Sequence, residues 1–123
     1  MNHKIIARQG AAKECFICGT ENEGGLHAAF YELDNKKVVC VFTAKDIHGG
    51  HPGILHGGVI CSILDETAGR AMTVLAPENT GALTVQLEVK SDLVCKFTFR
   101  QKSLSGQFHS LFFCNDFHFL RDI

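Results

Sequence analysis

The most regular alternation of apolar and polar residues lies between residues 82 and 90, where the chain reads ALTVQLEVK. The apolar side chains share one side of an extended chain, so the pattern predicts a strand with one buried face. Residues 26–33 and 38–43 are also rich in strand-forming residues. The polar sequence DNKK between them favours a turn, so we expect an antiparallel hairpin.

The period changes in residues 59–75, where apolar residues recur three or four positions apart. No proline interrupts this segment, and Pro77 follows it, so the pattern predicts one long helix that ends before the proline. The preceding residues 46–58 are rich in glycine and histidine and predict a loop. We expect the core side of the helix to consist of Ile60, Ile63, Leu64, Ala68, Ala71 and Leu75.

Residues 93–101 and 107–120 predict two further strands, and for the polar residues 1–14 we expect at most a helical turn. The order is then a hairpin, a long helix and more strands. This order favours an α+β fold in which an antiparallel sheet packs on one helix. The length of 123 residues fits a single domain, residues 1–123.

Composition narrows the classes of function. The chain has 12 Lys and Arg against 13 Asp and Glu, which predicts neither a nucleic-acid partner nor an acidic membrane surface. No apolar run is long enough to span a bilayer, and the first residues do not resemble a signal peptide. We therefore expect a cytoplasmic protein whose six cysteines are free thiols.

Two adjacent acids lie on different faces of the predicted helix. Glu66 and Arg70 are four residues apart, which is typical of a solvent-facing ion pair. Asp65 falls on a stripe of small or apolar residues that lets a ligand or a second chain approach closely. A carboxylate there is partly desolvated and more basic, so Asp65 is either a catalytic base or a polar residue at a subunit contact. The stripe consists of Gly58, Cys61, Asp65, Gly69 and Met72.

A pair of glycines, Gly57 and Gly58, stands where this helix is expected to begin. The first N–H groups of a helix lack internal partners, and glycine lets a ligand oxygen come close to them. The pair therefore favours an oxyanion-binding position, although glycine pairs are also common in ordinary turns. Asp65 follows about two helical turns later, which leaves room for an acyl group or a water molecule between them.

Cys15 and Cys18 have the spacing of a zinc knuckle. A structural zinc site needs four ligands and no second knuckle follows, so we expect two packed thiols and no metal. The nearest candidates for further ligands are His27, Cys40 and His48. Cys61 lies inside the helix, one turn before Asp65, and we expect it to pack rather than to act as a nucleophile.

The residues around the start of the helix resemble a known family. His56-Gly57-Gly58, six further residues and Asp65 are similar to the HGG-x6-D/E signature of hotdog-fold acyl-CoA thioesterases of the phenylacetate-degradation (PaaI) type. The segments CFICGTENEGGLHAAF, HPGILHGG and GALTVQLEVK resemble other parts of that family, and the match covers residues 15–90. The resemblance implies a hotdog fold, in which an antiparallel sheet wraps a long central helix.

The resemblance also implies a reaction, the hydrolysis of an acyl-CoA thioester to a free acid and CoA, without metal or other cofactor. Asp65 is implied as the general base or the nucleophile, and the Gly57 N–H as the donor to the thioester carbonyl. A site between subunits is implied, and with it a homodimer or a dimer of dimers (homotetramer). The other residues expected at the substrate site are His51, His56, Gly58, Glu66 and Thr84.

The sequence departs from this family in two places. Some relatives carry Asn or Gln six residues before the histidine, where this chain has Gly50, and His48 or His51 is a candidate substitute. Residues 91–123 are rich in phenylalanine and atypical, which allows for a sheet that is one strand short. Two alternatives therefore stay open: an acyl-CoA-binding or vestigial protein without turnover, and a hotdog hydratase or dehydratase that pairs a histidine with Asp65.

Overall fold

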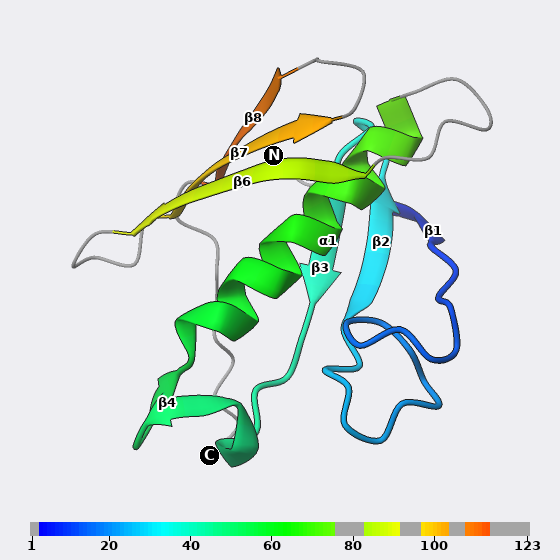
Figure 1. Cartoon of the computed structure of the whole chain (residues 1–123). Coiled ribbons are helices and arrows are strands. Elements are labelled where there is room, and N and C mark those ends of the chain that lie inside the picture. The colour runs from blue at the N-terminus through cyan, green and yellow to red at the C-terminus, as the bar shows by residue number, and fades with distance from the viewer. Residues whose placement is uncertain (1–2, 76–82, 92–96, 104–107, 114–123) are drawn as a thin grey trace. The chain divides into compact units, whose positions relative to one another are not determined.

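The computed structural model describes residues 3–75, 83–91, 97–103 and 108–113 (Figure 1). The chain forms two compact units, Met1–Gly81 and Ala82–Ile123. The described residues contain one α-helix and antiparallel strands, in agreement with the predicted α+β class. The wrapping of the helix by a single sheet, which a hotdog fold requires, stays a prediction.

The first unit contains a three-stranded antiparallel sheet and the long helix. The strands are β1 (Ile5–Arg8), β2 (Ala29–Leu33) and β3 (Val38–Val41), with β2 in the centre. The helix α1 (Gly57–Leu75) contacts β2 and β3, as Figure 1 shows. Phe30 from β2 and Leu64 from α1 are the largest fully buried side chains among the described residues, so this contact is the centre of the core.

The predicted hairpin is confirmed, because β2 pairs antiparallel with β3 from Ala29 opposite Val41 to Glu32 opposite Val38. At the turn, the Lys37 N–H donates a hydrogen bond to the Asn35 side chain. The first strand is shorter than the predicted 26–33. The N–H groups just before it, those of Leu26 and Ala28, donate instead to the carbonyl oxygens of Phe16 and Ile17.

The expectation of a helical turn within residues 1–14 was wrong for residues 5–8, which form β1. This strand pairs antiparallel with β2, and Ile5 lies opposite Leu33. Two consecutive isoleucines, Ile5 and Ile6, favour an extended chain. The free edge of β2 supplies the backbone partners, and a distant edge of this kind leaves no signal in the local sequence.

Residues 46–58 are more ordered than a loop. They contain a short 3-10 helix, η1 (Asp46–His48), and a small hairpin of β4 (Gly49–His51) and β5 (Ile54–Leu55). Gly53 adopts a positive φ of 73° in the turn between the two strands, a conformation that favours glycine. The hairpin therefore fixes the path by which the chain reaches the start of α1.

The predicted helix is confirmed: it begins at Gly57, at the expected glycine pair, and its periodic segment 59–75 is helical throughout. Its predicted core side is confirmed at Ile63, Leu64, Ala68 and Ala71, which are buried. Ile60 is half-buried and Leu75, the last helical residue, is 59% exposed. Thr67 is buried as well. Its hydroxyl donates a hydrogen bond to the Ile63 carbonyl at 2.6 Å, so the buried hydroxyl has a partner without water.

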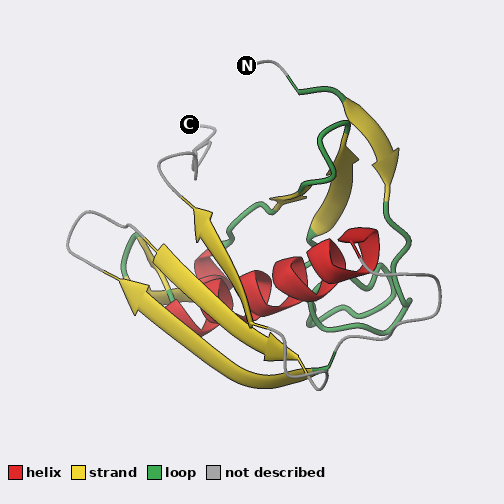
Figure 2. Ribbon diagram, turned by 90° about the horizontal axis from the view of Figure 1, so that it is seen from above, coloured by secondary structure: helices red, strands yellow, loops and turns green. Residues whose placement is uncertain are grey.

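The second unit contains three neighbouring antiparallel strands, which Figure 2 shows as adjacent arrows: β6 (Thr84–Ser91), β7 (Phe97–Ser103) and β8 (Phe108–Phe113). The alternation predicted β6, but the burial expected for its apolar face is not supplied by β7 or β8. Leu83, Val85 and Leu87 are 67%, 55% and 36% exposed. Strands of one sheet cover one another's edges and leave the faces open.

The predicted strand 107–120 is confirmed as far as Phe113. Its remainder, residues 114–120, lies outside the described residues, and so does Pro77. A sheet that is one strand short therefore stays a prediction. Within the described ranges, no helix combines the length and the apolar character needed to cross a membrane.

Candidate active site

The start of α1 is capped by the histidine that precedes it. His56 accepts the Gly58 N–H on its Nδ1 atom at 2.9 Å, and its carbonyl accepts the Val59 N–H at 3.0 Å. A side-chain acceptor at this position satisfies one of the N–H groups that a helix leaves without an internal partner. His56 therefore orients the first turn.

The same geometry distinguishes the two glycines of the pair. The Gly58 N–H is engaged by His56, whereas the Gly57 N–H has no hydrogen-bond partner among the described residues. A Cβ atom added at Gly57 would meet nothing within 4 Å, while one at Gly58 would lie 3.0 Å from the His56 Nδ1 atom. Gly57 thus offers both an available donor at the positive end of the helix and the space for an incoming oxygen atom.

The chain before His56 is held in place by His48. The Nδ1 atom of His48 accepts the Lys45 N–H at 3.1 Å, and its carbonyl accepts the His56 N–H at 2.9 Å. The ring is buried beside Phe42, with ring centroids 5.3 Å apart. Burial lowers the pKa of His48, and the positive charge of Lys45 lowers it further. His48 therefore acts as a neutral structural support for the helix start.

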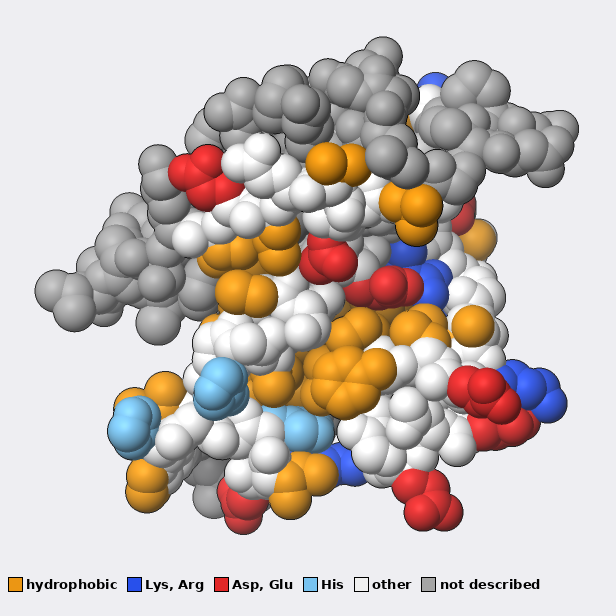
Figure 3. Space-filling model, viewed as in Figure 1, with side chains coloured by type: hydrophobic (Ala, Val, Ile, Leu, Met, Phe, Trp, Pro, Cys, Tyr) orange, Lys and Arg blue, Asp and Glu red, His pale blue; other side chains and the backbone are white. Residues whose placement is uncertain are grey.

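His51 is exposed in β4. Figure 3 shows histidine side chains gathered around β4 and the start of α1. Gly50, in the position where some relatives carry Asn or Gln, lies against His56, since an added Cβ atom would be 3.3 Å from the His56 Cδ2 atom. A larger residue there would have to displace His56, and this close approach explains the glycine.

Asp65 lies in the third turn of α1 and is half-buried. Two of its stripe neighbours, Cys61 one turn before and Gly69 one turn after, are also half-buried. A Cβ atom added at Gly69 would meet nothing within 4 Å, so the stripe has open space at that position. Eight residues at 1.5 Å per residue separate Asp65 from Gly57 by about 12 Å along the helix axis.

Thr84 is exposed at the first position of β6, in the second unit. Of the other residues expected at the site, His56, Gly57 and Asp65 belong to the first unit, where they share α1 and the segment that leads into it.

Glu66 lies in a different environment from the one predicted. It accepts a hydrogen bond from Arg70 Nε at 2.9 Å, as the i, i+4 spacing indicated, but Arg70 is only 14% exposed and Glu66 only 32%. The guanidinium lies 4.3 Å over the ring of Phe30 and donates to the Gly10 carbonyl at 2.9 Å and to the Cys18 sulfur at 3.0 Å. The expectation of a solvated pair was wrong, because residues 9–18 cover it.

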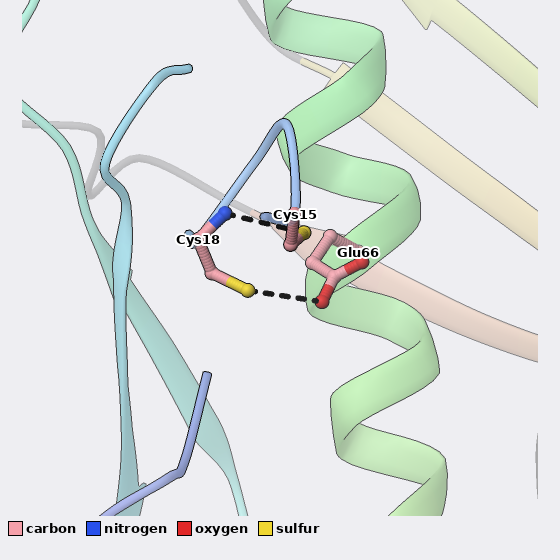
Figure 4. Close-up of side chains that lie close together, drawn as sticks. All are labelled: Cys15, Cys18 and Glu66. Atoms are coloured by element: carbon pink, nitrogen blue, oxygen red, sulfur yellow. Dashed lines mark hydrogen bonds between the residues drawn. The ribbon is translucent and has the colours of Figure 1, made fainter. Parts of the chain in front are cut away.

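The turn at residues 15–18 places two thiols beside this pair. Figure 4 shows Cys15, Cys18 and Glu66 pointing toward one another, and their ligand atoms all lie within 4.8 Å. The further ligands expected from the sequence, His27, Cys40 and His48, are not in this group. Nothing in the local sequence pointed to Glu66, which lies 48 positions after Cys18.

The two thiols differ in acidity. Burial raises the pKa of Cys15, but hydrogen bonds from the Cys18 and Ile17 N–H groups and from the Cys18 thiol hold that pKa below its ordinary value. Burial raises the pKa of Cys18, and so does its hydrogen bond to Cys15, while the charge of Arg70 opposes the rise. In β3, burial raises the pKa of Cys40 to about 11.

Part of the chain resembles a known family. Residues 52–90 match the family model described as Thioesterase superfamily. The matched segment contains β5, the helix start, the whole of α1 and most of β6, and so includes Gly57 and Asp65. This superfamily implies a hotdog fold, with which one helix and antiparallel sheets are consistent.

Individual acyl-CoA thioesterases also match part of the chain. The chain is 43% identical over 49 residues to acyl-coenzyme A thioesterase THEM4 of Rattus norvegicus, covering 40% of this chain and 21% of that protein. It is 31% identical over 71 residues to acyl-coenzyme A thioesterase THEM5 of Homo sapiens, covering 58% and 28%, and 34% identical over 70 residues to THEM5 of Mus musculus, covering 57% and 27%. The chain therefore spans about a quarter of the length of these relatives. No solved structure matches it significantly.

Proposed function

We propose that this protein hydrolyses acyl-CoA thioesters, with Gly57 and Asp65 as the catalytic residues. One observation carries the proposal: an available N–H donor with open space at the start of α1 precedes, by about two turns, a half-buried carboxylate on a stripe of small residues. The superfamily match over residues 52–90 and the similarity to acyl-CoA thioesterases support it.

In the proposed reaction, the Gly57 N–H donates to the thioester oxygen and stabilises the negative charge that develops there. The Asp65 carboxylate takes a proton from water while the water oxygen attacks the carbonyl carbon. The tetrahedral intermediate then expels CoA as a thiolate, which takes up the proton that Asp65 received, and the acyl group leaves as a free acid. Direct attack by Asp65 on the carbonyl, followed by hydrolysis of the anhydride, is the other route the same residues allow.

The surrounding residues position these two groups. His56 holds the first turn through Gly58, so that Gly57 is the residue that presents its N–H. We assign His51 and Thr84 to the substrate site on the family resemblance. Glu66 is left out of this assignment, because Arg70 and Cys18 contact its carboxylate.

We also propose that the active form is a homodimer or a dimer of dimers. The exposed apolar side chains of Leu83, Val85 and Leu87 support this, because a row of apolar residues gains stability when a second copy covers it. Sedimentation velocity is expected to give a dimer or tetramer, and Val85→Lys is expected to lower the association constant by at least about tenfold. A wild-type monomer at micromolar concentration would contradict the assembly.

The test of the activity is the release of CoA from short, medium, long and aryl acyl-CoAs. Chromatographic detection is required, because the six cysteines of the protein react with thiol dyes. We expect turnover on part of the panel and a loss of at least about 1,000-fold in Asp65→Asn. A folded wild-type protein that binds these compounds without turning them over would contradict the proposal and favour an acyl-CoA-binding function.

A further inference from the structure

The turn at residues 15–18 has a geometry that prepares a sulfur atom for a metal ion. The N–H groups of Ile17 and Cys18 point at the Cys15 sulfur from 3.3 Å and 3.4 Å. The Gly19 N–H closes the turn on the Cys15 carbonyl at 2.8 Å. Because sulfur is a weak acceptor when protonated, two N–H donors favour the thiolate, the form that binds metals.

Gly19 makes this turn possible. An added Cβ atom would lie 2.5 Å from the backbone N and O atoms of Cys15 and from the Lys13 carbonyl. These are backbone atoms that cannot move aside, so no other residue fits without opening the turn. Gly19 therefore allows the turn in CFICG to close with both sulfur atoms on the same side of the turn.

The helix supplies a third ligand opposite the turn. The Cys18 sulfur lies 3.9 Å from Glu66 Oε1, and the two sulfur atoms and a Glu66 oxygen all lie within 4.8 Å of one another (Figure 4). Ligands of one tetrahedral zinc ion are roughly 3.5–3.8 Å apart. Small side-chain movements therefore suffice for all three to share one ion.

Charge favours a divalent cation. Two thiolates and one carboxylate carry three negative charges, and Arg70 supplies one positive charge through its contacts with Cys18 and Glu66. The Phe30 ring and the Gly10 carbonyl hold Arg70 beside the three candidate ligands. A divalent ion would bring the total to zero, with Arg70 as the outer partner that stabilises the deprotonated ligands.

We propose that Cys15, Cys18 and Glu66 bind one zinc ion. Thiolate ligands with one carboxylate suit Zn²⁺ better than Mg²⁺ or Ca²⁺, which prefer oxygen atoms alone. Three protein ligands leave the fourth position for a water molecule. The ion would fasten the 15–18 turn to α1 on the Glu66 face, about 100° around the helix from Asp65, so the site is separate from the proposed hydrolysis.

The first experiment measures metal content and cobalt binding in the full chain, purified with zinc and a phosphine reductant. Elemental analysis is expected to find one zinc per chain. After exchange, Co²⁺ is expected to give thiolate-to-metal charge-transfer absorption. Wild-type protein that holds no zinc and gives no such absorption would overturn the proposal, and so would a Cys15–Cys18 disulfide that persists in the reductant.

Variants locate the ion. Cys15→Ser and Cys18→Ser are expected to lower Co²⁺ affinity by at least about 100-fold, and Glu66→Gln and Arg70→Gln by about 10–100-fold. The matched controls are Cys40→Ser and Cys61→Ser, which are expected to keep wild-type affinity. Unchanged affinity in Cys15→Ser and Cys18→Ser would overturn the proposal. If these two variants do not fold, the Co²⁺ affinity of Glu66→Gln and the metal content of the wild-type protein decide whether the proposal stands.

Discussion

Asp65 and Glu66 are neighbours in the sequence, but α1 places them in two different settings. Asp65 lies among half-buried, small positions with open space at Gly69. Glu66 is held by Arg70 and contacts Cys18. The rotation of about 100° per residue places the two carboxylates on different faces of the helix. Our proposal assigns them separable roles, Asp65 in the chemistry and Glu66 in the stability of the fold.

The largest effect on the fold is expected from Arg70. Replacement by Met removes the ion pair, the contacts to Gly10 and Cys18 and the stacking on Phe30. It also leaves the partly buried Glu66 carboxylate without its cation, so the free energy of unfolding is expected to fall by about 2–4 kcal/mol. Urea denaturation measures this change.

The matched control for that variant is Arg8→Met in β1. Arg8 is exposed and lies 6.0 Å from the Tyr31 ring, so its loss is expected to change the free energy of unfolding by less than about 0.5 kcal/mol. Equal losses in Arg8→Met and Arg70→Met would mean that the Glu66 face carries no special share of the stability.

Gly57 and Gly58 test the proposed catalytic site, the other side of the comparison between Asp65 and Glu66. Gly57→Ala adds a methyl group in open space, so the fold is expected to be unaffected while kcat/KM falls about tenfold, because the methyl group crowds the N–H donor. Gly58→Ala pushes on the His56 ring and is expected to lower stability by about 1 kcal/mol. Activity and melting temperature, measured on both variants, should differ in this way. Identical behaviour would argue against Gly57 as the donor.

A smaller effect is expected from pH. The folded pKa of His48 lies below its unfolded value, so its contribution to stability is present above the unfolded pKa, about 6.5, and is lost as pH falls through the folded pKa. We expect stability to fall on acidification, and this loss is expected to be absent in His48→Gln and retained in His51→Gln. Melting curves at pH 8 and pH 5 measure it, and equal acid sensitivity in wild type and His48→Gln would contradict the role of His48.

The sequence was sufficient for those features that depend on local patterns. Helix α1, the β2–β3 hairpin and β6 follow from periodicity and turn residues. The pairing of β1 and the surroundings of Arg70 were missed. Both depend on contacts between distant segments, such as Arg70 with Gly10, which are 60 positions apart. A favourable i, i+4 spacing indicated the ion pair but not its burial.

The most direct test of the account compares Asp65→Asn with Glu66→Gln on one acyl-CoA substrate, with kcat/KM and melting temperature measured for each. We predict a crossed result. Asp65→Asn loses at least about 1,000-fold in kcat/KM and keeps its melting temperature, while Glu66→Gln loses about 1 kcal/mol of stability and changes kcat/KM per folded molecule by less than about threefold. Comparable losses of activity in both variants would contradict the division of the two carboxylates between chemistry and fold.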